Sequence, residues 1–228
     1  MIVDALIPAL NEEESLPTVL DGLKGRGIRR VVVVDNGSSD HTYQVIERHG
    51  GVALYEGQRG YGAACLRGLR WMAADPPDVV VFLDGDGADD PDDLPALLAP
   101  IEAGEAEMVI GSRVRGQAEA GALTPQARFG NTLACTLIKW LYGVEFTDLG
   151  PFRAVTWSAL ERMQMADEDF GWTVEMQVKA PRRSIPSAEV PVDYRRRVAG
   201  QSKVAGTIKG SFQAGVKILY VIGREVLP

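Results

Sequence analysis

Residues 79–91 read Val-Val-Val-Phe-Leu-Asp-Gly-Asp-Gly-Ala-Asp-Asp-Pro. The five apolar residues at its start are too few for a buried helix and predict a buried strand that ends in acid. Asp84 and Asp86 lie two residues apart, so in extended backbone their side chains point the same way. Two close carboxylates repel each other unless a cation lies between them, and Mg²⁺ and Mn²⁺ take such oxygen ligands. We therefore predict a metal–diphosphate site, with Gly85 and Gly87 allowing the backbone to approach the ligand closely.

Two other interpretations of this stretch have to be weighed. Asp-Gly-Asp-Gly is also ordinary turn chemistry, so a plain loop stays open as an alternative. A calcium-binding EF-hand is excluded, because the twelfth loop residue would be Pro95 instead of glutamate and because a strand, not a helix, is predicted in front of the loop.

The composition is that of a globular protein, with 228 residues, 46% hydrophobic and 24% charged. Cys65 and Cys135 occur without a CxxC pattern and indicate neither a disulfide framework nor a zinc site. The first residues lack the features of a signal peptide, and no run of 18 apolar residues could span a bilayer. We therefore expect a cytoplasmic protein.

The net charge of −7 is unevenly distributed along the chain. Residues 181–228 carry nine Lys and Arg against three Asp and Glu, whereas residues 1–180 carry 15 against 28. A basic tail on an acidic protein is expected to face an anion, which could be a diphosphate, an anionic lipid or a membrane surface.

Strands and helices are predicted to alternate at short spacing. This pattern is typical of an α/β fold with a Rossmann-like, doubly wound and mostly parallel sheet, followed by a less regular second half. The predicted helices lie at about 11–25, 40–48, 62–74, 92–103, 126–142 and 173–180. The predicted strands are residues 2–7, 31–34, 52–55, 79–83, 108–110 and 189–192.

Two helices of the second half have informative apolar spacing. The helix at 126–142 is expected to turn Leu133, Leu137, Ile138 and Leu141 inward. The last helix is amphipathic, and it would either dock on a membrane surface or pack on its own domain or on a second copy of the chain. Its apolar stripe is Val204, Ile208, Phe212, Val216, Leu219 and Val226, with Tyr220 beside it and Lys209, Lys217 and Arg224 as basic flanks.

The first two predicted strands also end in hydrogen-bond acceptors. Residues 8–14 read Pro-Ala-Leu-Asn-Glu-Glu-Glu where a dinucleotide-binding fold would have GxGxxG. Glutamates would repel a pyrophosphate there, but they accept hydrogen bonds from a base or a ribose, as does Asp35. Helix capping by Asn11 and Asp35 is the alternative. Acids at three strand ends favour a nucleotide–diphosphate–metal cleft, because ligands bind at the carboxyl ends of parallel strands.

Several blocks of the sequence resemble the signature blocks of family 2 glycosyltransferases of GT-A fold. The resemblance is closest to the dolichyl-phosphate and polyprenyl-phosphate sugar transferase branch, and it covers nearly the whole chain in order. The matching blocks are residues 7–13 (IPALNEE), 33–40 (VVDNGSSD), 60–64 (GYGAA), 84–91 (DGDGADDP), 111–113 (GSR), 148–153 (DLGPFR) and 197–203 (RVAGQSK).

The resemblance implies one GT-A domain over residues 1–228, with a nucleotide-sugar half at 1–112, an acceptor half at 113–199 and a C-terminal amphipathic helix at 200–228. It implies that Asp84 and Asp86 hold Mg²⁺ or Mn²⁺, and that Arg197 and Lys203 bind the acceptor or neutralise phosphates of the donor or the acceptor. The implied nucleotide-sugar-binding residues are Pro8, Leu10, Glu12, Asp35, Gly60, Asp84, Gly85, Asp86 and Arg113.

The implied reaction moves a hexose from GDP-mannose or UDP-glucose to a polyprenyl phosphate with inversion. A phosphate acceptor is already anionic, whereas a hydroxyl acceptor needs a general base. Besides Asp86 at the metal, the candidate catalytic residues are Asp148, Glu175 and Asp169. A small hydroxylated or glycan acceptor is the alternative within this class, and a non-catalytic nucleotide-sugar-binding subunit is the alternative outside it.

Three positions depart from the usual pattern of this branch. Ala88 stands where Gln is common two residues after the second metal-binding Asp, and Asn36 stands where a second Asp is common. Residues 149–151 read Leu-Gly-Pro in place of Thr-Ser-Gly. The first departure implies that one metal ligand is either missing or replaced by water, and the last leaves the acceptor open.

Overall fold

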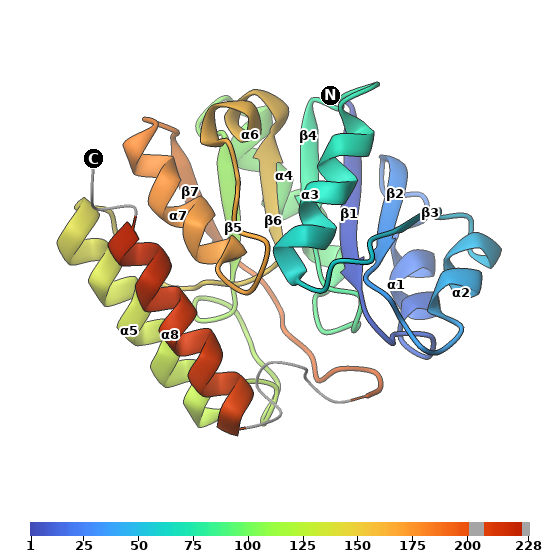
Figure 1. The fold of residues 1–228 in the computed structure, drawn as a ribbon. Coiled ribbons are helices and arrows are strands. Elements are labelled where there is room, and N and C mark those ends of the chain that lie inside the picture. Colours follow the sequence, from blue (N-terminus) through green and yellow to red (C-terminus); the bar gives the residue numbers. More distant parts are fainter. Residues whose placement is uncertain (201–207, 225–228) are drawn as a thin grey trace.

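A seven-stranded sheet forms the centre of the molecule (Figure 1). The computed structural model describes residues 1–200 and 208–224, and the side chains of the last helix from residue 215 on. The strands are β1 (Val3–Ala9), β2 (Ile28–Asp35), β3 (Val52–Tyr55), β4 (Val79–Phe82), β5 (Met108–Ser112), β6 (Arg153–Thr156) and β7 (Ser187–Pro191). Their order in the sheet is β3-β2-β1-β4-β6-β5-β7.

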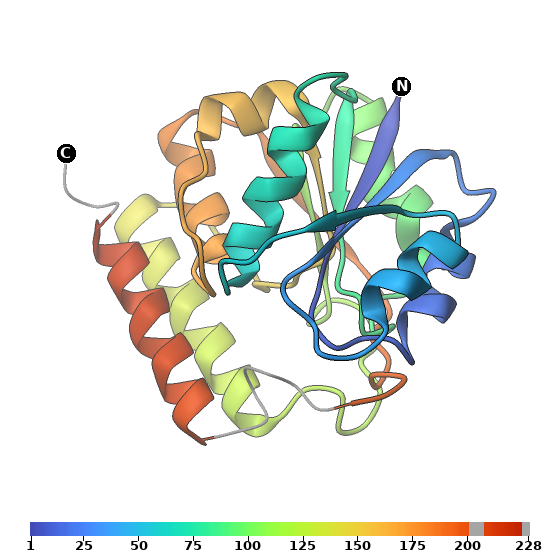
Figure 2. The same cartoon turned by 45° about the vertical axis from the view of Figure 1, so that its right-hand side comes forward.

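Helices cover both faces of the sheet, as Figure 2 shows from a second side. They are α1 (Leu16–Leu23), α2 (Thr42–Arg48), α3 (Tyr61–Met72), the short 3₁₀ helix η1 (Pro91–Asp93), α4 (Leu94–Glu102), α5 (Pro125–Tyr142), α6 (Trp157–Met163), α7 (Trp172–Arg182) and α8 (Ile208–Arg224). One cluster of buried apolar side chains joins the sheet to α3 and α5–α8, and a second joins the opposite face to α1, α2 and α4.

The predicted α/β fold with a mostly parallel sheet is confirmed. β1 pairs in parallel with β2 and β4, β2 pairs in parallel with β3, and β5 with β7. All four residues of β4 are buried, as its continuous apolar run predicts for a central parallel strand. The chain moves from β1 to β2 and β3 on one side and places β4 on the other, so the topological switch point lies between β1 and β4.

β6 is an antiparallel strand between β4 and β5 that the sequence analysis missed, together with α6 behind it. Its first residue, Arg153, is buried and gives no strand signal. Arg153 can occupy this position because its guanidinium donates to the carbonyls of Gly150 and Thr173 and to the side chain of Gln177. These partners come from the turn before β6 and from α7, and no local sequence pattern links the strand to α7.

The predicted apolar face of α5 is partly wrong, and the stripe of α8 is partly exposed. Ile138 is buried and Leu137 packs partly buried against the core, as expected. On α8, the buried side chains are Val221 and Ile222. Because α5 and α8 pack on each other and on α7, burial follows these neighbours and not the longest apolar stripe. Leu133 and Leu141, which were predicted to face inward, are instead exposed. Val216 and Leu219 of the α8 stripe are exposed as well.

Part of the predicted stripe cannot be compared with the structure. Val204 and Val226 lie outside the described residues, and so do the side chains of Ile208 and Phe212. Within the described ranges, none of the helices combines the length and the apolar composition that a membrane span requires.

A buried ion-pair network fixes the amino end of β1 to β2. Asp4 is fully buried, and its carboxylate accepts hydrogen bonds from Arg29 at 2.9 and 2.8 Å and from Arg30 at 3.1 and 2.7 Å. Burial would raise the pKa of Asp4, but the hydrogen bonds from the two arginines outweigh it and hold the pKa below its usual value. The network lies at the end of the sheet opposite to the carboxyl ends of the strands.

Replacing Asp4 by Asn should lower the free energy of unfolding at pH 7 by about 3 kcal/mol, because it removes one charge from a buried pair. Because the pKa of Asp4 is lowered in the folded state, the stabilisation is present above about pH 4 and is lost as the pH falls through the folded pKa. Urea unfolding at pH 7 and pH 3.5 should show the difference between Asp4→Asn and wild type shrinking at acid pH. A difference that grows at acid pH would contradict this assignment.

Candidate active site

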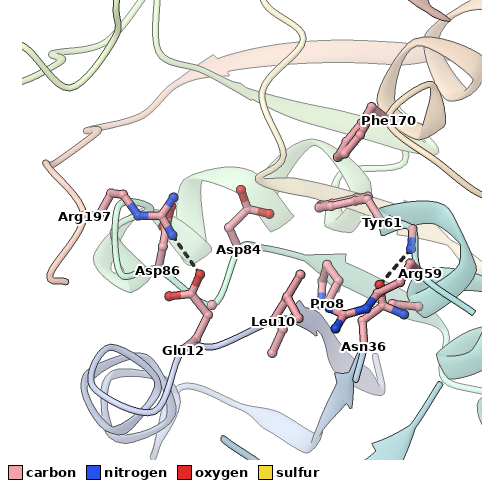
Figure 3. Close-up of a pocket in the computed structure, with 14 residues that line it drawn as sticks. Pro8, Leu10, Glu12, Asn36, Arg59, Tyr61, Asp84, Asp86, Phe170 and Arg197 are labelled. Atoms are coloured by element: carbon pink, nitrogen blue, oxygen red, sulfur yellow. Dashed lines mark hydrogen bonds and ion pairs between the residues drawn. The ribbon is translucent and has the colours of Figure 1, made fainter. Parts of the chain in front are cut away.

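A cavity of about 250 Å³ opens at the carboxyl ends of β1, β2 and β4 (Figure 3). Most of the predicted nucleotide-sugar residues line it, whereas Asp35 and Arg113 do not. The lining residues are Pro8, Ala9, Leu10, Glu12, Asn36, Arg59, Gly60, Tyr61, Ala64, Asp84, Gly85, Asp86, Phe170 and Arg197.

Asp84 and Asp86 project from the loop that follows β4 toward the cavity (Figure 3). Oδ1 of Asp86 accepts a hydrogen bond from the amide of Ala88 at 2.9 Å. Oδ1 of Asp84 is buried and has no hydrogen-bond partner among the described residues. Burial, and next the charge of Asp86, raise the pKa of Asp84 to about 7. Such an uncompensated oxygen beside a second carboxylate is the donor set that a hard divalent cation fits.

A third acid, Asp89, lies next to this pair. Asp89 is buried, and its Oδ2 accepts from the amide of Asp84 at 3.2 Å while its Oδ1 has no partner in the described part of the chain. Burial, and then the charges of Asp84 and Asp86, hold the pKa of Asp89 well above its usual value. No group of three or more His, Cys, Asp or Glu among the described residues is arranged to hold a metal by itself. A cation on Asp84 and Asp86 would therefore take further ligands from water or from a bound molecule.

Arg197 supplies positive charge to these carboxylates. It comes from the segment after β7, and its guanidinium lies 2.7 Å from Oε1 of Glu12 and 3.4 Å from Oδ2 of Asp86. The segment is held over the loop after β4, because the amide of Val198 donates to the carbonyl of Asp86 at 3.0 Å. The structure thus brings Arg197 to the predicted site. Lys203 lies outside the described residues.

The amide of Asn36, and not the neighbouring carboxylate of Asp35, faces the cavity. Asp35 is buried and its Oδ1 accepts from the amide of Ser38 at 2.8 Å, so it holds the turn after β2 and does not cap α2, which begins at Thr42. Oδ1 of Asn36 accepts from the amide of Gly60 at 2.8 Å (Figure 3), and its Nδ2 donates to the carbonyl of Gln58 at 2.6 Å. Asn36 therefore fixes the glycine-rich loop at the edge of the cavity.

The glycine-rich loop packs tightly on the segment in front of α7. Gly60 has a φ of +147°, and a Cβ at Gly60 would lie 2.1 Å from the carbonyl oxygen of Glu168. A Cβ at Gly62 would lie 1.9 Å from the carbonyl oxygen of Asp167. Only glycine permits this approach, which brings Phe170 to the wall of the cavity.

Arg113 and Asp148 form a buried pair beside a second cavity. The guanidinium of Arg113 contacts Asp148 at 2.8 and 2.7 Å and stacks on Tyr194 with 5.0 Å to the ring centroid. Asp148 also accepts from the amide of Arg113 at 2.8 Å and is 1% exposed. Burial would lower the pKa of Arg113, but the hydrogen bond and charge of Asp148 raise it. Asp148, predicted as a candidate base, is therefore fully engaged with a cation.

The second cavity has a volume of about 380 Å³ and is lined by the loop after β5 and by the first turns of α5. Arg113 at its wall stacks on Tyr194, which forms a β-bridge with Asp89 in the loop after β4, so the two cavities lie on the same side of that loop. Its lining residues are Arg113, Val114, Gly116, Ala118, Leu123, Ala127, Arg128, Asn131, Thr132 and Asp148.

The other two candidate bases are also ion-paired. Glu175 is fully buried, accepts from the amides of Ala166 and Asp167, and pairs with Lys179 at 2.8 Å and with Arg224 at 3.1 Å. It thereby ties α7 to the preceding loop and to α8. Asp169 lies 3.4 Å from Nζ of Lys217 on α8. Glu175 and Asp169 line neither of the two cavities.

Sequence analysis did not single out several lining residues. Arg59 and Tyr61 lie in the glycine-rich segment 57–62 (GQRGYG), which overlaps the matching block at 60–64, so their positions could have been predicted from that segment. Arg128 and Phe170 reach the cavities only through the fold, because they follow the nucleotide half by many residues and match no local motif.

This arrangement agrees with a comparison to protein families. The model described as "Glycosyl transferase family 2" matches residues 4–163, which include the ends of β1, β2 and β4. The chain belongs to glycosyl transferase family 2. This family 2 glycosyltransferase is therefore an enzyme of the class that its sequence blocks implied.

Curated relatives share most of its length. It is 36% identical over 213 residues to an uncharacterised glycosyltransferase of Mycobacterium tuberculosis, a match that covers 93% of this chain and 94% of the relative. It is 31% identical over 224 residues to the undecaprenyl-phosphate mannosyltransferase of Micrococcus luteus, with 92% and 90% covered.

A solved structure confirms the predicted GT-A fold class. Glucosyl-3-phosphoglycerate synthase from Mycobacterium tuberculosis, in complex with Mn²⁺, UDP-glucose and phosphoglyceric acid, matches the family 2 glycosyltransferase with a TM-score of 0.73. The match covers 97% of this chain and 80% of that one at 21% identity, so it establishes the shared fold.

The raised pKa of Asp84 has a consequence for stability. Because the folded-state pKa is about 7 and the usual value is near 4, ionisation of Asp84 destabilises the folded protein progressively from about pH 4 to pH 7. Without divalent metal, Asp84→Asn should therefore raise the free energy of unfolding at pH 8, by on the order of 3 kcal/mol, and leave it nearly unchanged at pH 4. Thermal unfolding in the presence of a chelator measures this; a variant less stable than wild type at pH 8 would contradict it.

If Asp148 serves to hold Arg113, the two substitutions Asp148→Ala and Arg113→Ala should each destabilise the protein. A double-mutant cycle by urea unfolding should give a coupling energy of about 3 kcal/mol, because each single variant leaves a buried charge unpaired. Additive effects of the two substitutions would show instead that Asp148 is available as a base.

Proposed function

We propose that this family 2 glycosyltransferase transfers a hexose from GDP-mannose or UDP-glucose to a polyprenyl phosphate, with inversion at the anomeric carbon. The observation that carries the proposal is the carboxylate pair Asp84 and Asp86 at the switch point of the sheet, facing a cavity walled by Pro8 and Leu10. The kinship to an undecaprenyl-phosphate mannosyltransferase supports the acceptor class, and the UDP-glucose and Mn²⁺ of the structural neighbour support the donor class and the metal.

Asp84 and Asp86 would hold the divalent cation, Mg²⁺ or Mn²⁺. When bound, the cation would stabilise the negative charge of the nucleoside diphosphate as it leaves. Arg197, which lies within ion-pair distance of Asp86, would neutralise further diphosphate charge. The apolar side chains of Pro8, Leu10 and Phe170 would form the walls of a slot for the base.

The state of the candidate bases favours a phosphate acceptor. Asp148, Glu175 and Asp169 are each ion-paired, and the first two are also buried. A hydroxyl acceptor would need one of them to be free to take a proton, whereas a phosphate oxygen can attack without a base. The second cavity offers Arg113 and Arg128 to a phosphate, and Arg113 stacks on Tyr194, which is bridged to Asp89 beside the carboxylate pair.

Donor and acceptor can be identified with purified protein, Mn²⁺ or Mg²⁺, a panel of UDP- and GDP-sugars, and a polyprenyl phosphate in detergent. We expect sugar transfer to the lipid phosphate that Asp86→Ala lowers by about a hundredfold or more, since metal-ion stabilisation of the leaving group contributes several kcal/mol. Asp92→Ala is the matched control, because Asp92 belongs to the same acidic stretch but pairs with Arg26 outside the cavity.

The other results separate the alternatives. Metal-dependent hydrolysis of the donor without transfer to the lipid would keep the donor cavity and exclude the lipid acceptor, and would point to a hydroxylated or glycan acceptor. Donor binding without turnover across all acceptors would indicate a non-catalytic nucleotide-sugar-binding subunit.

A further inference from the structure

Residues 193–198, which we call the strap, run between the loop after β4 and the loop after β5. On one side, the amide of Arg195 donates to the carbonyl of Ala88 at 2.8 Å. On the other side, the amide of Tyr194 donates to the carbonyl of Gln117 at 2.9 Å. The strap therefore connects the loop that carries the carboxylate pair to the loop that lines the second cavity.

Tyr194 is the residue at which the strap contacts both loops. It forms one isolated β-bridge with Asp89 in the loop after β4 and another with Ala118 in the loop after β5. Its carbonyl also accepts from the amide of Glu119 at 2.8 Å. Because the backbone of Tyr194 is paired on both sides, its side chain starts from a fixed position relative to both loops.

The ring of Tyr194 supports the guanidinium of Arg113. The guanidinium carbon lies 5.0 Å from the ring centroid, and Nε and Nη2 donate to Asp148 at 2.8 and 2.7 Å. Contact with a ring face and with a carboxylate fixes the plane of a guanidinium. Among the described residues, none accepts a hydrogen bond from Nη1 of Arg113, whose side chain is 14% exposed and lines the second cavity. Nη1 can therefore donate to an anion in that cavity.

We propose that Tyr194 is a positioning residue that fixes the acceptor phosphate relative to the metal. Asp84 and Asp86 would place the cation and the diphosphate, and Arg113 would place the acceptor phosphate. Tyr194 contacts the loop of the first site and the guanidinium of the second, so it sets the separation of the two. This inference rests on the proposed function.

The proposed transfer depends on that separation. An oxygen of the acceptor phosphate forms a bond to the anomeric carbon while the bond from that carbon to the diphosphate oxygen breaks, and the diphosphate keeps the electron pair. The rate of such a displacement depends on the alignment of the entering and leaving oxygens. A shift of the Arg113 guanidinium should therefore slow transfer without weakening the hold on the donor.

A merely structural role of Tyr194 predicts a different outcome. Its side chain lines neither of the two cavities, and the backbone hydrogen bonds of the strap do not require a tyrosine. Removing the ring should leave the strap and the carboxylate pair in place and release the guanidinium of Arg113. Loss of packing alone would instead weaken metal–nucleotide binding together with acceptor binding.

The variants Tyr194→Leu and Tyr194→Phe separate these roles. Titration calorimetry without metal or donor should show that Tyr194→Leu binds farnesyl phosphate, a short polyprenyl phosphate, about tenfold more weakly than wild type. Tyr194→Phe keeps the ring face and should bind it like wild type. Both variants should bind Mn²⁺ with UDP or GDP as wild type does, which also checks that the fold is intact.

The matched control is Tyr55→Leu, the same substitution on β3. Tyr55 is 59% exposed, and β3 is the edge strand on the side of the sheet away from β5 (Figure 1). This variant should keep both affinities.

The ratio of transfer to hydrolysis gives a second readout. Hydrolysis of the donor by water uses the metal site and not the second cavity. Tyr194→Leu should therefore lower kcat for transfer to farnesyl phosphate by about tenfold or more and leave the rate of donor hydrolysis unchanged.

Equal binding of farnesyl phosphate by Tyr194→Leu and wild type would overturn the proposal, and so would a parallel loss of farnesyl phosphate and Mn²⁺–nucleotide binding. Failure of Tyr194→Phe to bind like wild type would assign the effect to the hydroxyl and would also overturn it. If wild type binds farnesyl phosphate in a way that depends on the ring of Tyr194 but transfers no sugar to it, the proposed function is wrong and the positioning of Arg113 is upheld.

Discussion

Repulsion among carboxylates at the end of β4 is the constraint on which the site depends. Asp84, Asp86 and Asp89 follow a central strand that is buried on both faces, so they cannot move apart without disturbing the sheet. Among the described residues, the guanidinium of Arg197, 3.4 Å from Asp86, neutralises part of this charge. Such repulsion lowers the stability of the folded state. A cation bound between the carboxylates, together with an anionic ligand, would reduce the repulsion at this place.

The segments that complete the site come from distant parts of the chain and are locked to one another. Gly62 permits α3 to touch the backbone of Asp167, and the carboxylate of Asp167 lies 3.0 Å from Lys217 on α8. Glu175 joins α7 to the same helix through Arg224. The cavity at the carboxyl ends of the strands and helices α3, α7 and α8 therefore belong to one continuously packed unit.

The first half of the fold could be predicted from sequence because its signals are local. A short apolar run followed at once by Asp84 and Asp86 specifies both a central strand and the carboxylates at its end. Much of the second half could not, because its determinants are long-range. β6 begins with the buried Arg153, whose hydrogen-bond partners come from α7 and from the turn before the strand. Leu133 was expected to be buried because it belongs to an apolar stripe, but no neighbouring element among the described residues covers it. The engagement of Asp148 by Arg113 is likewise visible only in three dimensions.

The central claim is that Asp84 and Asp86 bind a divalent cation together with a nucleoside diphosphate. Titration of Mn²⁺ followed by electron paramagnetic resonance, with and without UDP or GDP, tests it directly. We predict weak binding of Mn²⁺ alone and binding at least about tenfold tighter with the nucleotide, because the diphosphate supplies ligands that the protein lacks. Asp84→Asn and Asp86→Asn should abolish this gain, while Asp92→Asn should keep it. Mn²⁺ binding that is equally strong without nucleotide, or that survives both substitutions, would contradict the account.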